Sequence, residues 1–86
     1  MERIEPKNVS IKMRIEKNGR GGKTVTVLFS LPNNPTYFTD LTKKLKSHCG
    51  SGGTFKDGRV EIQGDHKIRI KAYLEAIGFK VIQAGA

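Results

Sequence analysis

Two stretches of alternating apolar and polar residues, separated by a short glycine-rich loop, constrain the fold of this chain most strongly. In residues 9–16 the apolar side chains fall on every second position, at Val9, Ile11, Met13 and Ile15. In residues 24–30 the pattern recurs at Val25, Val27 and Phe29. A period of two is typical of a strand with one face on the core and the other toward water. We therefore predict an antiparallel hairpin in which each apolar stripe faces the core.

The loop between these stretches reads Lys17-Asn18-Gly19-Arg20-Gly21-Gly22-Lys23 and contains three cations, three glycines and no acid. Glycine permits positive φ and a close approach of a ligand to the backbone, and exposed cations suit phosphate groups. A phosphate-binding P-loop is excluded, because Lys17 stands where that motif needs its first glycine and a strand follows in place of a helix. The loop favours nucleic acid as the partner.

Helix signals follow the hairpin. Asn34 and Pro35 are typical of an N-cap and a first helical position, and Gly50 is typical of a helix end. Between them Phe38, Leu41 and Leu45 recur at helical spacing.

The second half of the chain repeats the order of strands and helix. Asp57-Gly58 fits a type I′ turn between strands at 54–56 and 59–63. Asp65 is a candidate N-cap, and Gly78 ends a helix before a last strand at 79–83. The apolar face of this helix comprises Ile70, Tyr73, Leu74 and Ile77.

These elements predict an α/β fold of order ββαββαβ. We expect a two-layer sandwich, a mainly antiparallel five-stranded sheet with two helices on one face. We further expect residues 9–86 to form a single domain, preceded by a short N-terminal segment at residues 1–8.

Catalytic and metal chemistry find no support in the residues. The adjacent His48 and Cys49 lack a third group to orient the histidine, and two histidines with one cysteine fall short of a zinc site. Gly50-Ser51-Gly52-Gly53 matches the G-x-x-G of KH domains, but a strand follows, and a flexible joint is the better interpretation. We predict no catalytic residue, no metal ligand and no cofactor.

The start of the chain lacks the apolar stretch of a signal peptide, and no apolar run approaches the ~20 residues that span a bilayer. The single cysteine forms no internal disulfide. The expectation is a cytoplasmic monomer without a membrane partner.

The net charge points to an anionic partner. Sixteen Lys and Arg against eight Asp and Glu give a net charge of +8 on 86 residues, which attracts RNA, DNA or an anionic membrane. Only six residues are aromatic, so we expect contacts to shape and phosphate more than base stacking. Beyond the loop, cations gather on the two predicted helices, at Lys43, Lys44 and Lys46 and at Lys67, Arg69 and Lys71.

Several segments together resemble the eukaryotic translation initiation factor 1 family, also called the SUI domain, and look closest to its short prokaryotic members. The similarity runs from about Val9 to Gly85. The segments that carry it are residues 18–26, residues 41–46, residues 49–54 and the run from Lys56-Asp57-Gly58 to Ile62-Gln63-Gly64-Asp65.

This resemblance implies the same sandwich and a non-enzymatic role at the small ribosomal subunit in start-codon and initiator-tRNA selection. It implies rRNA contact through the hairpin loop and the first helix. The corresponding residues are Asn18, Gly19, Arg20 and Lys23, and then Lys43, Lys44 and Lys46. The partners it implies are the small-subunit rRNA, with other initiation factors, initiator tRNA and mRNA.

One alternative stays open. In this alternative the domain is a protein-interaction or accessory ribosome-associated module without a direct role in codon selection, and its positive charge only aids solubility. Salt separates the two hypotheses, because phosphate contacts weaken steeply as salt rises and an apolar protein interface does not.

Overall fold

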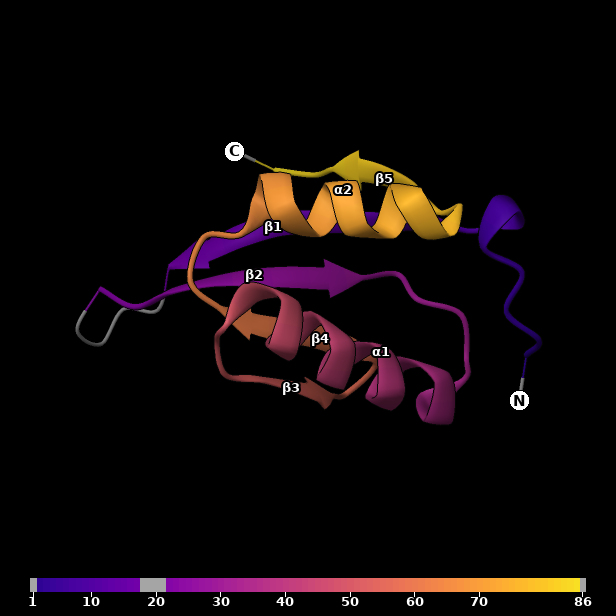
Figure 1. Cartoon of the computed structure of the whole chain (residues 1–86), viewed down its shortest axis with the longest axis horizontal. Coiled ribbons are helices and arrows are strands. Elements are labelled where there is room, and N and C mark those ends of the chain that lie inside the picture. Colours follow the sequence, from indigo (N-terminus) through magenta and orange to yellow (C-terminus); the bar gives the residue numbers. More distant parts are fainter. Residues whose placement is uncertain (1, 18–21, 86) are drawn as a thin grey trace.

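The computed structural model describes residues 2–17 and 22–85 and confirms the predicted order ββαββαβ (Figure 1). Both helices lie on one face of the sheet. In chain order the elements are the 3-10 turn η1 (Pro6–Asn8), β1 (Ser10–Lys17), β2 (Thr24–Phe29), α1 (Pro35–Cys49), β3 (Gly53–Lys56), β4 (Arg59–Gln63), α2 (Lys67–Ile77) and β5 (Lys80–Gln83).

The five strands form one sheet of order β3-β4-β2-β1-β5. Neighbouring strands are antiparallel except β1 and β5, which are parallel. Parallel strands need a crossover connection, and a helix usually supplies it. Here α1 connects β2 to β3 and packs on β3 and β4, whereas α2 connects β4 to β5 and packs on β5 and β1. The two helices therefore cover different halves of the same face.

The ends of α1 follow the sequence signals. The side chain of Asn34 accepts a hydrogen bond of 3.1 Å from the backbone N–H of Tyr37, and Pro35 occupies the first turn. At the other end Gly50 adopts a left-handed φ of 62°, and its N–H bonds back to the last carbonyls of the helix. These caps satisfy backbone groups that a helix end otherwise leaves unpaired.

The predicted orientation of β2 is wrong. Met13 pairs with Leu28 and Ile15 pairs with Thr26, so Thr26 and Leu28 lie on the helix side of the sheet. Val25, Val27 and Phe29 face the opposite, helix-free side. The alternation predicts a strand here but not which of its two faces meets the helices, because every position from Val25 to Phe29 carries an apolar or β-branched residue.

The core lies between the sheet and the two helices. Its buried residues are Ile11, Met13, Leu28, Phe38, Leu41, Leu45, Val60, Ile62, Ile70, Leu74 and Phe79. Tyr73 is half-buried, and Ile77 remains 40% exposed although its helical spacing predicted a core position. It falls on the last residue of α2, at the margin of the core.

The helix-free face is covered by its own side chains. Glu16 pairs with Arg14 at 2.6 Å and with Arg59 at 3.4 Å, and Arg59 also pairs with Glu61. Arg14 and Glu61 are the cross-strand neighbours of Val27 on its two sides, and Val27 has no exposed surface although no helix covers it. Val25 and Phe29, on the same face, are half-buried.

Two turn signals have different outcomes. Asp57 and Gly58 both have positive φ, 53° and 74°, as a type I′ turn requires. The N-cap of α2 is His66 and not the predicted Asp65, whose carboxylate accepts a long hydrogen bond of 3.3 Å from the N–H of Lys67. The ring of His66 is engaged elsewhere and gives no capping bond.

Candidate nucleic-acid interface

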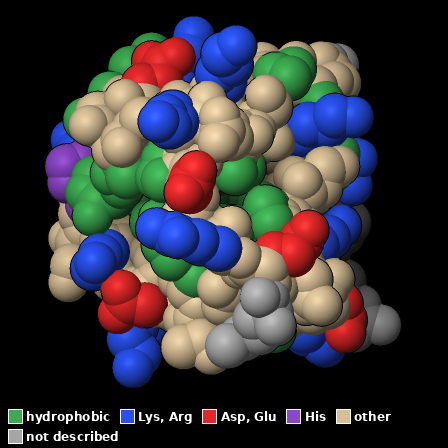
Figure 2. All heavy atoms as spheres, turned by 90° about the vertical axis from the view of Figure 1, so that its right-hand side faces the viewer, with side chains coloured by type: hydrophobic (Ala, Val, Ile, Leu, Met, Phe, Trp, Pro, Cys, Tyr) green, Lys and Arg blue, Asp and Glu red, His purple; other side chains and the backbone are tan. Residues whose placement is uncertain are grey.

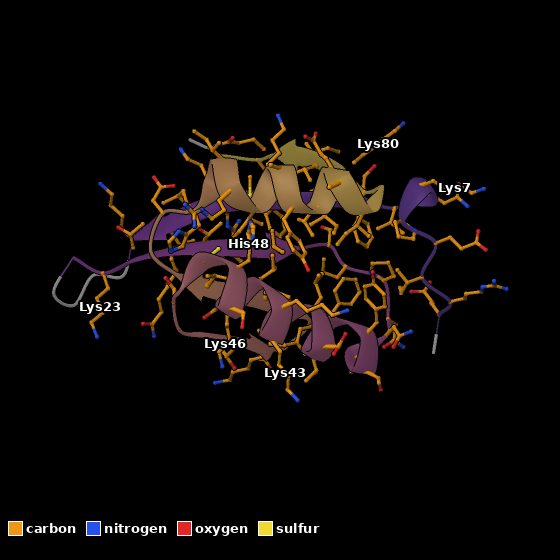
Figure 3. The ribbon with its side chains drawn as sticks, in the orientation of Figure 1. Lys7, Lys23, Lys43, Lys46, His48 and Lys80 are labelled. Carbon is orange, nitrogen blue, oxygen red and sulfur yellow. The ribbon has the colours of Figure 1, made fainter. Side chains whose placement is uncertain are left out.

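The hairpin of β1 and β2 extends past the helices at one end of the molecule. Its last described pair joins Lys17 to Thr24, and Figure 3 shows Lys23 beyond the end of α1. Lys23 is exposed, and Gly22 next to it has a φ of 65°. Three predicted site residues, Asn18, Gly19 and Arg20, lie outside the described part of the chain. The structure thus places one predicted cation of the loop at an exposed, projecting position.

The three predicted lysines of α1 do not form one group. Lys46 lies on the side of the helix that points away from α2 (Figure 3), and its aliphatic part packs over Gly53. Lys43 lines a surface hollow together with Tyr73 of α2. Lys44 forms an ion pair of 3.1 Å with Asp40, one turn earlier. The hydrogen bond to Asp40 raises the pKa of Lys44 above its ordinary value. Its charge is therefore partly neutralised, whereas Lys43 and Lys46 form no ion pair among the described residues.

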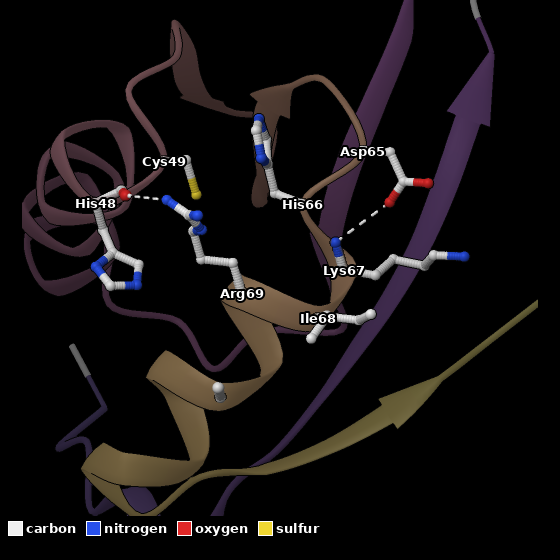
Figure 4. A pocket seen from close by; sticks show the side chains of 8 residues that line it. His48, Cys49, Asp65, His66, Lys67, Ile68 and Arg69 are labelled. Atoms are coloured by element: carbon white, nitrogen blue, oxygen red, sulfur yellow. Dashed lines mark hydrogen bonds between the residues drawn. The ribbon is translucent and has the colours of Figure 1, made fainter.

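Sequence reasoning missed the place where the two helices meet. The guanidinium of Arg69, in the first turn of α2, donates a hydrogen bond of 3.3 Å to the backbone carbonyl of His48 near the end of α1 (Figure 4). The rings of His48 and Tyr73 lie 4.9 Å apart with a tilt of 48°. The spacing of Arg69 and Tyr73 places both on one face of α2, but no sequence signal connects them with His48 on another helix.

A hollow opens at this meeting point. Its wall combines the end of α1, the turn after β4 and the first turns of α2. Burial raises the pKa of the Cys49 thiol in this wall, and the charge of Arg69 offsets part of that effect. The lining residues are His48, Cys49, Asp65, His66, Lys67, Ile68, Arg69 and Ala72.

A hydrogen-bonded node fixes the turn between β4 and α2. The Nε2 atom of His66 lies 2.9 Å from the carbonyl oxygen of Gln63 and 2.9 Å from the hydroxyl of Ser51. Since a carbonyl only accepts hydrogen bonds, Nε2 carries a proton. The backbone N–H of His66 donates to the hydroxyl of Thr26, which donates to the carbonyl of Gly64. This node joins the turn to β2 and to the segment after α1.

Neither a metal site nor a membrane-spanning helix is found in residues 2–17 and 22–85. No cluster of three or more His, Cys, Asp and Glu side chains has the arrangement of a metal site. No helix in these ranges has the length and apolarity needed to cross a membrane.

Fold and surface together define a small basic α/β sandwich with a projecting hairpin. A model of the translation initiation factor SUI1 family matches residues 7–80, so the chain belongs to this family. The family is one of translation factors and not of enzymes.

Relatives support this assignment. A protein translation factor SUI1 homolog of Sulfolobus acidocaldarius is 38% identical over 78 residues, which cover 91% of this chain and 78% of the relative. The uncharacterized protein YciH of Escherichia coli is 39% identical over 83 residues, covering 95% and 77%. An uncharacterized protein of Synechocystis sp. is 43% identical over 82 residues, covering 95% and 74%.

Proposed function

We propose that this chain acts in translation initiation as a non-enzymatic factor that binds rRNA of the small ribosomal subunit and influences the selection of start codon and initiator tRNA. The observation that carries the proposal is the basic hairpin, which projects past the helices in a chain of the SUI1 family. The name of the Sulfolobus acidocaldarius relative, a translation factor homolog, supports the same role.

In this proposal the hairpin approaches folded RNA and the exposed side of α1 contacts phosphates beside it. The contact residues are Asn18, Gly19, Arg20 and Lys23 on the hairpin and Lys43, Lys44 and Lys46 on α1. Lys44 contributes least, because Asp40 already neutralises part of its charge. We place the protein in the cytoplasm as a monomer, with initiator tRNA, mRNA and other initiation factors as neighbours on the subunit.

The test is co-sedimentation with purified small and large subunits over a range of salt. The double variant Arg20→Ala, Lys23→Ala removes two hairpin cations. Each lost phosphate contact reduces the steepness of a plot of the logarithm of the binding constant against the logarithm of the salt concentration by about 1. We therefore expect a shallower slope and weaker binding to small subunits. A start-codon reporter run with the same variant measures selection.

The matched control is Lys7→Ala, Lys80→Ala, which removes the same charge at the other end of the molecule (Figure 3). We expect it to bind nearly as the parent chain does. Equal binding and codon selection by hairpin variant and parent chain would refute the role of the hairpin. Binding that ignores salt would favour the protein-interaction alternative.

A further inference from the structure

A groove runs between α1 and α2 along the helix layer. Three hollows follow one another there, and each shares lining residues with the next. His48 belongs to the first and second hollows, and Lys44 and Tyr73 belong to the second and third. The groove therefore reaches from the end of α1, where α2 starts, to the opposite ends of both helices.

Apolar surface continues to the far end of this groove. Figure 2 views the molecule from the side where α1 begins and α2 ends, and shows hydrophobic side chains gathered near the middle, with charged side chains around and across them. The hydrophobic residues that line the third hollow are Tyr37, Leu41, Tyr73 and Ile77.

The middle of the groove presents aromatic rings. His48 is exposed and Tyr73 is half-buried, so part of the ring pair at 4.9 Å is open to solvent. Base stacking was disfavoured by the low aromatic content of the sequence, but the tertiary structure brings these two rings together. A planar base stacks on such rings whatever its sequence.

Cations line the same groove. Lys43 contributes to the second hollow, and Lys67 and Arg69 contribute to the first. The ion pairs of residues 2–17 and 22–85 leave all three without a carboxylate partner, since Asp40 pairs with Lys44. Asp65 is the one acid in the lining of the first hollow, and it accepts the backbone N–H of Lys67. The groove therefore combines uncompensated positive charge with open aromatic surface.

We propose that this groove binds an unpaired segment of RNA, with a base against His48 and Tyr73 and the flanking phosphates near Arg69, Lys67 and Lys43. The proposal rests on the proposed function, because it adds a single-strand site to an RNA-binding domain. An acidic peptide satisfies the cations but leaves the rings unused, whereas a nucleotide uses both.

The test is a titration of the full chain with short oligouridylate and oligoadenylate, followed by NMR of the His48 and Tyr73 ring protons. Quenching of tyrosine fluorescence is a second readout, because the chain has two tyrosines and no tryptophan. Stacking of one base is worth a roughly tenfold change in affinity, so His48→Ala should weaken binding by about that factor. His48→Phe should restore it, since the phenyl ring still stacks.

Polyglutamate of similar length is the competing probe. Equal affinity for polyglutamate, or oligonucleotide affinity that His48→Ala leaves unchanged, would overturn the inference. Hydrogen-exchange or circular dichroism spectra like those of the parent chain show that His48→Ala remains folded.

Failure of the two proposals can be told apart. Salt-sensitive binding to small subunits without ring shifts in the oligonucleotide titration contradicts the groove and retains the function. Ring shifts without binding to small subunits contradict the function and retain the groove.

Discussion

Cys49 shows how one residue's surroundings set its chemistry. It ends α1 beside the groove, and it is the only cysteine of the chain. Burial raises the pKa of its thiol, and the charge of Arg69 counteracts this only in part. Because the thiolate is the reactive form, the folded protein should hold this cysteine in a poorly reactive state.

We expect native chain to react with iodoacetamide more slowly than chain unfolded in urea at the same mildly alkaline pH. The raised pKa of Cys49 also affects stability. The contribution of this thiol to the free energy of unfolding is complete below its pKa in the unfolded chain, and it is lost as the pH rises through its pKa in the folded chain. Alkylation rates measured by mass spectrometry test the first statement, and a native rate equal to or above the unfolded rate would contradict it. Urea unfolding of the chain across the same pH range tests the second, and a free energy of unfolding that does not fall through this range would contradict it.

At the scale of elements, the glycine-rich joint after α1 is tightly packed at Gly53, against β4 and α1. A Cβ at Gly53 would lie 2.6 Å from Cδ1 of Ile62 and 2.7 Å from the carbonyl oxygen of Glu61. At Gly52 the nearest atoms belong to the flexible side chain of Gln63, at 3.4 Å. The start of β3 therefore depends on a glycine that lets two strands and α1 approach closely.

Gly53→Ala should lower the free energy of unfolding by about 1–3 kcal/mol, because the added methyl group would push the side chain of Ile62 and the backbone carbonyl of Glu61 away from β3. Gly52→Ala is the matched control one position earlier, and we expect a change within about 0.5 kcal/mol. Urea unfolding followed by circular dichroism measures both. Similar values for the two variants would mean that the joint is the flexible segment that its composition predicted.

At the scale of the whole molecule, the N-terminal segment packs on the domain. The N–H of Glu2 donates to the carbonyl of Asn33 at 2.9 Å, and the side-chain amide of Asn34 donates to the carbonyl of Glu2 at 2.9 Å. Ile4 packs against the core cluster. We propose that residues 9–86 are the unit that folds and that residues 1–8 add stability to it.

Deletion of residues 1–8 should leave a cooperative unfolding transition with a free energy lower by about 1–3 kcal/mol, the order of the burial of one aliphatic side chain. The variant Ile4→Ala in the full chain isolates the apolar part of that loss. Urea unfolding monitored by circular dichroism measures both effects. Loss of the cooperative transition on deletion would show that the segment belongs to the folding unit.

The sequence predicted the elements of this fold because their signals are local. Alternation at residues 9–16, the capping residues Asn34 and Gly50 and the Asp57-Gly58 turn each act within a few positions of the chain. Their agreement predicted the order ββαββαβ and the two-layer arrangement. For the candidate site, local signals identified the basic hairpin and the lysines of α1 but not how those lysines divide between two sides of the helix.

Sequence by itself thus determined the order of the strands and helices, the caps of α1, the net positive charge and the glycine-rich loop that connects β1 to β2. Only the tertiary structure decided which face of β2 meets the helices, since both faces of that strand are apolar and its partner strands select one. Tertiary packing alone also brought His48, Arg69 and Tyr73 together. His48 belongs to α1 and the other two residues belong to α2, and the crossover connections that place those helices side by side depend on long-range pairing of strands.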